Sequence, residues 1–107
     1  MFRINVYVPQ THLEAVKVAM FGAGAGRMGL YDSCCWQTKG EGQFRPLMGS
    51  DAFIGAVDKL EKVVEYKLEM VCEAASIKKA LRAMIAAHPY EEVAYDLYPA
   101  LSLKDFD

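Results

Sequence analysis

The chain has 107 residues, of which 53% are hydrophobic and 24% are charged, and its net charge is −2. These values predict one globular domain over residues 1–107 rather than a disordered chain. Lysines and arginines are scattered among acidic residues, so neither a nucleic-acid partner nor a membrane partner is expected. No apolar run approaches the roughly 20 residues of a membrane span, and the N-terminal MFRINVYVP lacks a signal-peptide pattern. A cytoplasmic protein is therefore expected.

The number and spacing of the cysteines also agree with a cytoplasmic protein. Cys34 and Cys35 are adjacent and Cys72 is remote, which is a poor framework for disulfides. No CxxC motif indicates structural zinc. The three thiols are expected to be reduced and mainly structural.

The first third of the chain predicts a strand followed by a helix. Residues 2–8 alternate between apolar and polar side chains, which is typical of a half-buried strand, and Pro9 closes it. Residues 11–14 have the pattern of a capping box. An amphipathic helix follows, with apolar side chains at helical spacing, and Gly22 begins the run of glycines that ends it.

The middle of the chain predicts a hairpin and a loop. Residues 30–38 are rich in aromatic and small side chains, and residues 39–42 read as a turn containing glycine. Residues 43–46 form the expected second arm, which ends at a proline. Residues 48–60 have no clean period and predict a crossing loop with one helical turn.

The last third predicts a strand over residues 66–72, an amphipathic helix over 77–85 and a final strand over 93–98. The order strand, helix, hairpin, strand, helix, strand indicates an α+β ferredoxin-like sandwich. Its antiparallel sheet would carry two helices on one face, with the hairpin as an extra element. Nothing in the chain covers the other face. Its polar side chains would allow it to be solvated, but aromatics such as Tyr7 and Trp36 favour its use in a homo-oligomer.

The stretch GAGAGRMG contains a literal GxGxxG pattern at Gly24, Gly26 and Gly29. In a dinucleotide site such glycines follow a strand and open a helix, so that amide dipoles point at the pyrophosphate. Here they follow a helix and precede a strand, so no dinucleotide site is expected. A tight connection that brings backbone amides close to a ligand or a neighbouring subunit is the preferred interpretation.

The segment HPYEE, residues 88–92, joins the second helix to the final strand. Pro89 disfavours helical backbone at His88, so the helix is expected to end there, with the imidazole near its last carbonyls. Glu91 and Glu92, if extended, point to opposite sides. Capping, subunit contact, and ligand or metal binding at a subunit boundary stay open. Catalysis is least favoured because no nucleophile and base, P-loop or GxSxG motif is present.

Three motifs together carry a family resemblance: GAGxxGxYxxC from Gly24 to Cys34, GxFxP from Gly42 to Pro46, and HPYEExAYDxYP from His88 to Pro99. In this order they resemble the inserted domain of the Nif-three-like, YqfO-type proteins, as a stand-alone copy. The HPYE core also resembles the trimeric CutA proteins.

The resemblance implies a PII/CutA-like module that oligomerises through its sheet. We expect a dimer or trimer that binds a small ligand or metal ion between subunits, at a site lined by the glycine connection and the HPYEE segment. The two-metal, hydrolase-like centre of the full-length family is built by domains flanking this insert, so no catalytic residue and no enzyme activity is expected here. A separate hydrolase domain is the alternative partner. No cofactor is expected beyond a divalent metal ion, with His88 as its candidate ligand. The other ligand-binding candidates are Gly24, Gly26, Gly29, Tyr31, Cys34, Tyr90, Glu91 and Glu92.

Overall fold

The computed structural model describes residues 1–107, which form a four-stranded sheet and two α-helices. In chain order the elements are β1 (Phe2–Pro9), α1 (Leu13–Gly22), β2 (Trp36–Phe44), β3 (Glu61–Cys72), α2 (Ile77–Ala87) and β4 (Tyr95–Pro99). Short 3-10 turns precede each α-helix, at Gln10–His12 and Ala74–Ser76, and another follows β4 at Leu103–Asp105.

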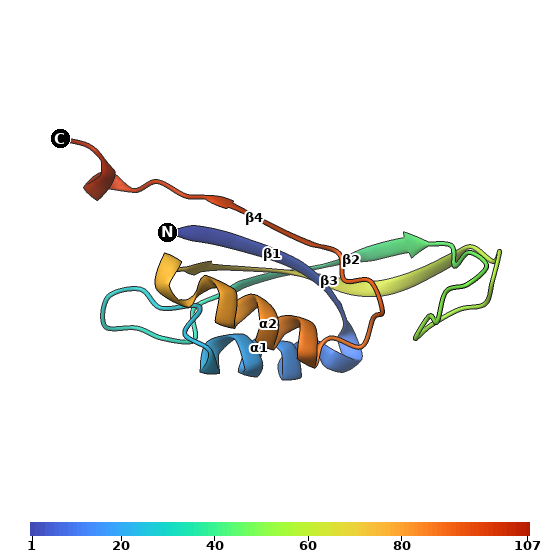
Figure 1. The fold of residues 1–107 in the computed structure, drawn as a ribbon. Helices are drawn as coiled ribbons and strands as arrows, with labels where there is room; N and C mark the ends of the chain where they lie inside the picture. The colour runs from blue at the N-terminus through green and yellow to red at the C-terminus, as the bar shows by residue number, and fades with distance from the viewer.

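The strands form one antiparallel sheet in the order β2-β3-β1-β4, with both helices on the same face (Figure 1). β1 lies between β3 and β4, so that Ile4 pairs with Met70 on one side and with Leu97 on the other. In each of the units β1-α1-β2 and β3-α2-β4, the two strands are separated in the sheet by one other strand, β3 in the first unit and β1 in the second. This topology confirms the predicted ferredoxin-like sandwich.

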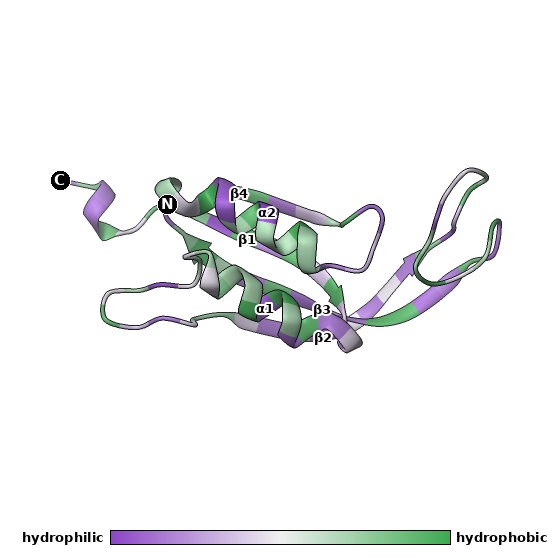
Figure 2. Ribbon diagram, turned by 60° about the horizontal axis from the view of Figure 1, so that its bottom comes forward, coloured by the Kyte–Doolittle hydropathy of each residue, from purple (hydrophilic) through white to green (hydrophobic).

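The core fills the layer between the sheet and the helices, which lie side by side across the sheet (Figure 2). Alternation along the strands and 3.6-residue spacing along the helices direct the apolar side chains into this layer. Its buried members include Ile4, Val6, Val8, Leu13, Val16, Met20, Leu68, Met70, Cys72, Ala80 and Met84. Removal of this apolar surface from water is the main favourable term in folding.

The predicted extra hairpin over residues 30–46 is wrong. β2 is one continuous strand that runs through both glycines of the expected turn and pairs with β3 from Trp36 opposite Glu69 to Phe44 opposite Glu61. The observed hairpin joins β2 to β3 through the loop 45–60 and projects beyond the rest of the sheet (Figure 1). β2 is an edge strand of the sheet.

Two further local predictions are wrong and one is confirmed. Thr11 does not cap α1, because its Oγ1 lies 2.8 Å from Nδ1 of His12 and no side chain caps the helix. The loop 45–60 contains turns and bends but no helical turn. α2 ends immediately before His88, whose backbone is extended at φ −81° and ψ 137°, as the following Pro89 predicts.

The sheet face opposite the helices is not covered by any element of this chain. The register places Trp36, Glu69, Asn5 and Asp96 in one row across the four strands on this face. Trp36 is 68% exposed, whereas Asn5 is buried among its neighbours. Asn5 Nδ2 donates to Asp96 Oδ1 over 2.8 Å, but the buried Oδ1 of Asn5 has no hydrogen-bond partner.

The molecule is elongated, with extents of 53 × 25 × 24 Å and a radius of gyration of 15.2 Å. A compact domain of this size would have a radius of about 13 Å. The difference arises because the β2–β3 hairpin projects at one end and the C-terminal residues at the other (Figure 1). Neither α-helix has the length and apolar character needed to cross a membrane.

Candidate functional site

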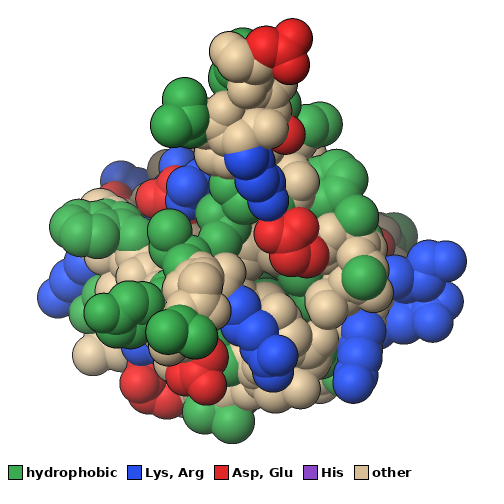
Figure 3. Space-filling view, turned by 90° about the vertical axis from the view of Figure 1, so that its left-hand side faces the viewer, with side chains coloured by type: hydrophobic (Ala, Val, Ile, Leu, Met, Phe, Trp, Pro, Cys, Tyr) green, Lys and Arg blue, Asp and Glu red, His purple; other side chains and the backbone are tan.

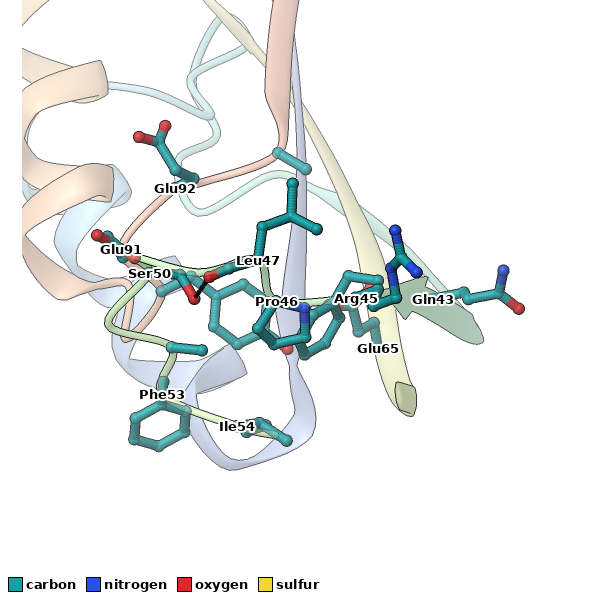
Figure 4. Close-up of a pocket in the computed structure, with 14 residues that line it drawn as sticks. Gln43, Arg45, Pro46, Leu47, Ser50, Phe53, Ile54, Glu65, Glu91 and Glu92 are labelled. Atoms are coloured by element: carbon teal, nitrogen blue, oxygen red, sulfur yellow. Dashed lines mark hydrogen bonds between the residues drawn. The ribbon is translucent and has the colours of Figure 1, made fainter. Parts of the chain in front are cut away.

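A cavity of about 400 Å³ lies where the loop 45–60 meets the segment between α2 and β4 (Figure 4). The end of β2, the loop, one residue of β3 and residues 90–94 supply its walls. Its lining consists of Gln43, Phe44, Arg45, Pro46, Leu47, Ser50, Ala52, Phe53, Ile54, Glu65, Tyr90, Glu91, Glu92 and Ala94. The volume falls within the range of small-molecule sites.

Aromatic side chains form one wall of the cavity. The ring centroid of Tyr90 lies 6.1 Å from that of Phe44 and 6.4 Å from that of Phe53, with tilted planes in both pairs. Phe53 also meets the His12 ring edge to face at 5.4 Å. Tilted contacts at these separations are favourable for aromatic rings. They hold the loop against the turn before α1 and against the HPYEE segment.

Glu65 reaches this wall because a glycine lies beside it on the neighbouring strand. Gly40 is its direct partner on β2, and Gly42 is its diagonal neighbour. A Cβ at Gly42 would collide with the Glu65 carboxylate, whereas a Cβ at Gly40 would meet nothing within 4 Å. The absence of a side chain at Gly42 therefore lets the Glu65 carboxylate lie over β2 and line the cavity.

Tyr90 supplies a buried phenol close to this carboxylate. Its hydroxyl oxygen is buried, accepts from no donor within the chain, and interacts with the Glu65 carboxylate. Burial raises the pKa of Tyr90 far above its ordinary value, and interaction with Glu65 raises it further. The phenol therefore stays protonated, and the Tyr90 hydroxyl and the Glu65 carboxylate both remain able to bond a ligand.

Glu91 and Glu92 lie on the same cavity, in a bend rather than in an extended strand. The expectation that they point to opposite sides assumed extended backbone, which the chain does not adopt here. Glu91 Oε2 accepts a hydrogen bond of 2.8 Å from the backbone N–H of Asp51. This bond joins the loop 45–60 to the HPYEE segment.

His88 uses both of its ring nitrogens within the chain. Nε2 lies 2.7 Å from the carbonyl oxygen of Tyr7, and Nδ1 lies 3.2 Å from the backbone nitrogen of Tyr90. Because the amide can only donate, Nδ1 accepts, and the neutral ring donates from Nε2. Burial lowers the pKa of His88 below 6.5, although the bond to Tyr7 opposes the shift. The imidazole joins β1 to the turn at Tyr90 instead of capping the carbonyls of α2.

Within one chain, His88 has no free ring nitrogen for the predicted divalent metal ion. Either nitrogen of His88 would have to give up a hydrogen bond to coordinate a metal. Within residues 1–107 no three His, Cys, Asp or Glu side chains are grouped so that they could hold an ion. In this chain His88 therefore supports the architecture of the HPYEE turn, and a metal ion shared with a second copy stays a prediction.

The glycine-rich connection lies at the opposite end of the helix layer from the cavity (Figure 1). Gly24, Gly26 and Gly29 all have positive φ, at 105°, 74° and 57°. The N–H of Gly26 donates to the carbonyl of Val71 over 2.8 Å, and the carbonyl of Gly26 accepts from the N–H of Cys34 over 2.8 Å. Gly26 thus fastens the connection to the end of β3.

The remaining candidates in this connection lie near the surface. Tyr31 is 75% exposed, and with Gly29 it lines a shallow depression. The Sγ of Cys34 donates to the carbonyl of Asp32 over 3.5 Å. Figure 3 shows this end of the molecule, where hydrophobic side chains stand apart among charged ones. Of the predicted ligand-binding residues, Tyr90, Glu91 and Glu92 therefore line the cavity, whereas Gly29 and Tyr31 line this separate depression.

Among the cavity residues that the sequence did not identify as site residues are Arg45, Phe53 and Glu65. In the sequence Glu65 is simply a polar residue in alternation with the apolar residues of the strand that follows it. The available signal was Gly42, because a glycine inside a strand often marks the close approach of another group.

The scan of protein-family models found no match to this chain. Among curated proteins, the GTP cyclohydrolase 1 type 2 homolog of Bacillus subtilis is 47% identical over 97 residues. That alignment covers 91% of this chain and 26% of the relative. The chain thus spans about a quarter of the length of the curated relatives that it matches.

Solved structures agree with this relationship. A Bacillus cereus protein related to NIF3 matches with a TM-score of 0.79 and 41% identity, over 92% of this chain and 25% of that one. CutA of Xylella fastidiosa matches with a TM-score of 0.68 and 18% identity, over 97% and 88% of the two chains. GlnK of Bacillus subtilis gives 0.60 and 10%, over 91% and 82%. The chain is a homologue of one segment of the NIF3-related GTP cyclohydrolase 1 type 2 homologs and has the fold of CutA and GlnK.

Proposed function

We propose that this chain is a non-catalytic binding module whose ligand occupies the cavity between the loop 45–60 and the HPYEE segment. One observation carries the proposal: two motifs that are remote in the sequence meet at that cavity. Phe44 and Pro46 of GxFxP and Tyr90 of HPYEE all line it. The third member of the first motif, Gly42, makes room for Glu65.

A cavity-filling variant tests this function. Ala52 lines the cavity, so Ala52→Trp should fill it and abolish binding of small ligands. Ala56→Trp is the matched control, because Ala56 is exposed on the same loop and does not line the cavity. Thermal-shift screening of a small-molecule library should find ligands of the wild type and of Ala56→Trp that Ala52→Trp does not bind. Hits shared by all three proteins would refute the assignment of the cavity as the site.

The module is also proposed to self-associate, as a dimer or trimer, through the uncovered face of the sheet. Support comes from the exposed Trp36 and Tyr98, which are 68% and 48% exposed. The buried Oδ1 of Asn5 supports it too, because an unpaired buried acceptor is costly until a donor reaches it. Burial of this face against a second copy would remove aromatic surface from water.

The partner proposed for the assembled module is a hydrolase domain of the kind that makes up the remainder of the NIF3-related chains. The chain corresponds to 26% of its Bacillus subtilis relative, so the relative carries much sequence outside this domain. The cysteines are free, which fits a reducing cytoplasm as the place of action.

A further inference from the structure

Glu65 is a half-buried carboxylate that has no cationic partner. The ion pairs of the chain join Lys17 to Glu14, Lys67 to Glu69, and Lys104 to Glu73. None of them includes Glu65, and the group that interacts with its carboxylate, the phenol of Tyr90, is neutral. A carboxylate placed against an apolar wall loses hydration, and a positive charge is the partner that restores this loss.

The residues around Glu65 indicate which kind of cation would fit beside it. Its neighbours on the cavity include the rings of Phe44, Phe53 and Tyr90, which favour an apolar or aromatic body. Tyr90 adds a buried hydroxyl oxygen that is free to accept a hydrogen bond. Aromatic faces also attract cations. A metal ion would find only one carboxylate at this wall.

The cavity carries more negative than positive charge. Glu65, Glu91 and Glu92 line it, against Arg45 as the only cationic side chain among the lining residues. Figure 4 shows Arg45 beside Gln43 on one flank, across the cavity from Glu91 and Glu92. No carboxylate lies within ion-pair distance of Arg45, so its charge does not neutralise Glu65. The volume of about 400 Å³ suits a small molecule.

From this arrangement we propose that the cavity binds a small organic amine in its protonated form, with its apolar body on the aromatic wall and its ammonium group at Glu65. The ammonium donates one hydrogen bond to the Glu65 carboxylate and a second to the hydroxyl oxygen of Tyr90. A charge-assisted bond of this kind is stronger than a neutral one. The inference rests on the proposed binding function and adds the chemical class of the ligand.

Three probes of equal shape and different charge test the inference. Benzylamine is cationic at pH 7.5, benzyl alcohol is neutral and benzoate is anionic. Isothermal titration of the full chain should give an affinity for benzylamine about tenfold or more above that for benzyl alcohol, as one charge-assisted hydrogen bond predicts. Benzoate should bind weakest.

Two variants assign the preference to Glu65. Glu65→Gln keeps the shape of the side chain and should bind benzyl alcohol as the wild type does, while losing the preference for benzylamine. Glu69→Gln is the control, because Glu69 lies on the same face of β3 but outside the cavity. It should leave all three affinities unchanged.

The outcomes separate the two proposals. Equal binding of the neutral and cationic probes, a preference for benzoate, or a cation preference that survives in Glu65→Gln would overturn the amine class and leave a cavity that binds ligands. Absence of binding by all three probes would overturn the binding function as well.

Discussion

Gly42 and Glu65 are diagonal neighbours on adjacent strands, and the Glu65 carboxylate occupies the space that a Cβ at position 42 would need. A glycine at position 42 of β2 therefore leaves room for the side chain of Glu65 on β3. This pair connects a sequence motif of β2 to the chemistry of the cavity.

Gly42→Ala should displace the Glu65 carboxylate and weaken binding of benzylamine by about tenfold, because the charge-assisted bond is lost. Gly40→Ala is a matched substitution, since Gly40 lies on the same strand face and a Cβ there meets nothing within 4 Å. It should bind benzylamine normally. Titration calorimetry of both variants makes the comparison, and equal affinities would contradict the role given to Gly42.

Gly26→Ala should destabilise the chain more than Gly29→Ala. Both residues have positive φ, which costs an L-residue about 1 kcal/mol. A Cβ at Gly26 would in addition lie 2.8 Å from the carbonyl oxygen of Cys34 and 2.8 Å from the ring of Phe21, whereas one at Gly29 meets nothing within 4 Å. Urea unfolding measures both losses, and a larger loss in Gly29→Ala would contradict the positions given to these glycines.

His88 should make stability fall at mildly acidic pH. Burial lowers its pKa in the folded state below 6.5, so the unfolded chain binds the proton first as pH falls. The contribution is complete above about pH 6.5 and is lost as pH falls from there through the lower folded-state pKa. Urea unfolding from pH 7.5 to 5, at fixed protein concentration, should show this loss.

Replacement of His88 checks the source of that pH dependence. His88→Asn should reduce stability at pH 7.5 by about 1–3 kcal/mol, because the carbonyl of Tyr7 and the N–H of Tyr90 lose their partner. It should also flatten the fall below pH 6.5. An unchanged profile in His88→Asn would assign the pH dependence to other groups.

The uncovered sheet face should hold copies of the chain together. Trp36→Lys and Tyr98→Lys place a charge on that face and should shift light-scattering mass toward the monomer at micromolar concentration. Val18→Lys is the control, because Val18 is 70% exposed on α1, on the side of the helices. A wild-type chain that is monomeric at micromolar concentration would rule out this mode of association.

Much of the fold could be predicted because apolar spacing and proline positions are local signals. The end of α2 before His88 followed from Pro89 alone. The continuity of β2 could not be foreseen, because Gly40 and Gly42 also have the composition of a turn. What decides between these interpretations is pairing with β3, a contact between residues that are distant along the chain.

The candidate site was predicted only in part for the same reason. Tyr90, Glu91 and Glu92 stand in one motif and were singled out together. Phe53 and Glu65 join them only after the loop folds back and β3 pairs with β2. The hydrogen bond between His88 and Tyr7 could not be predicted from the sequence either, because the two residues are distant along the chain and adjacent only in the folded structure.

The attachment of the loop 45–60 sets how the cavity opens. Apart from the strands that carry it, the loop is fastened by the hydrogen bond from Asp51 to Glu91 and by the ring contacts of Phe53, and its other bonds are internal. The cavity wall can thus detach by local opening while the sheet stays folded. The rate of hydrogen exchange at the Asp51 amide therefore reports how often the loop opens. A ligand bound in the cavity would lower that exchange rate.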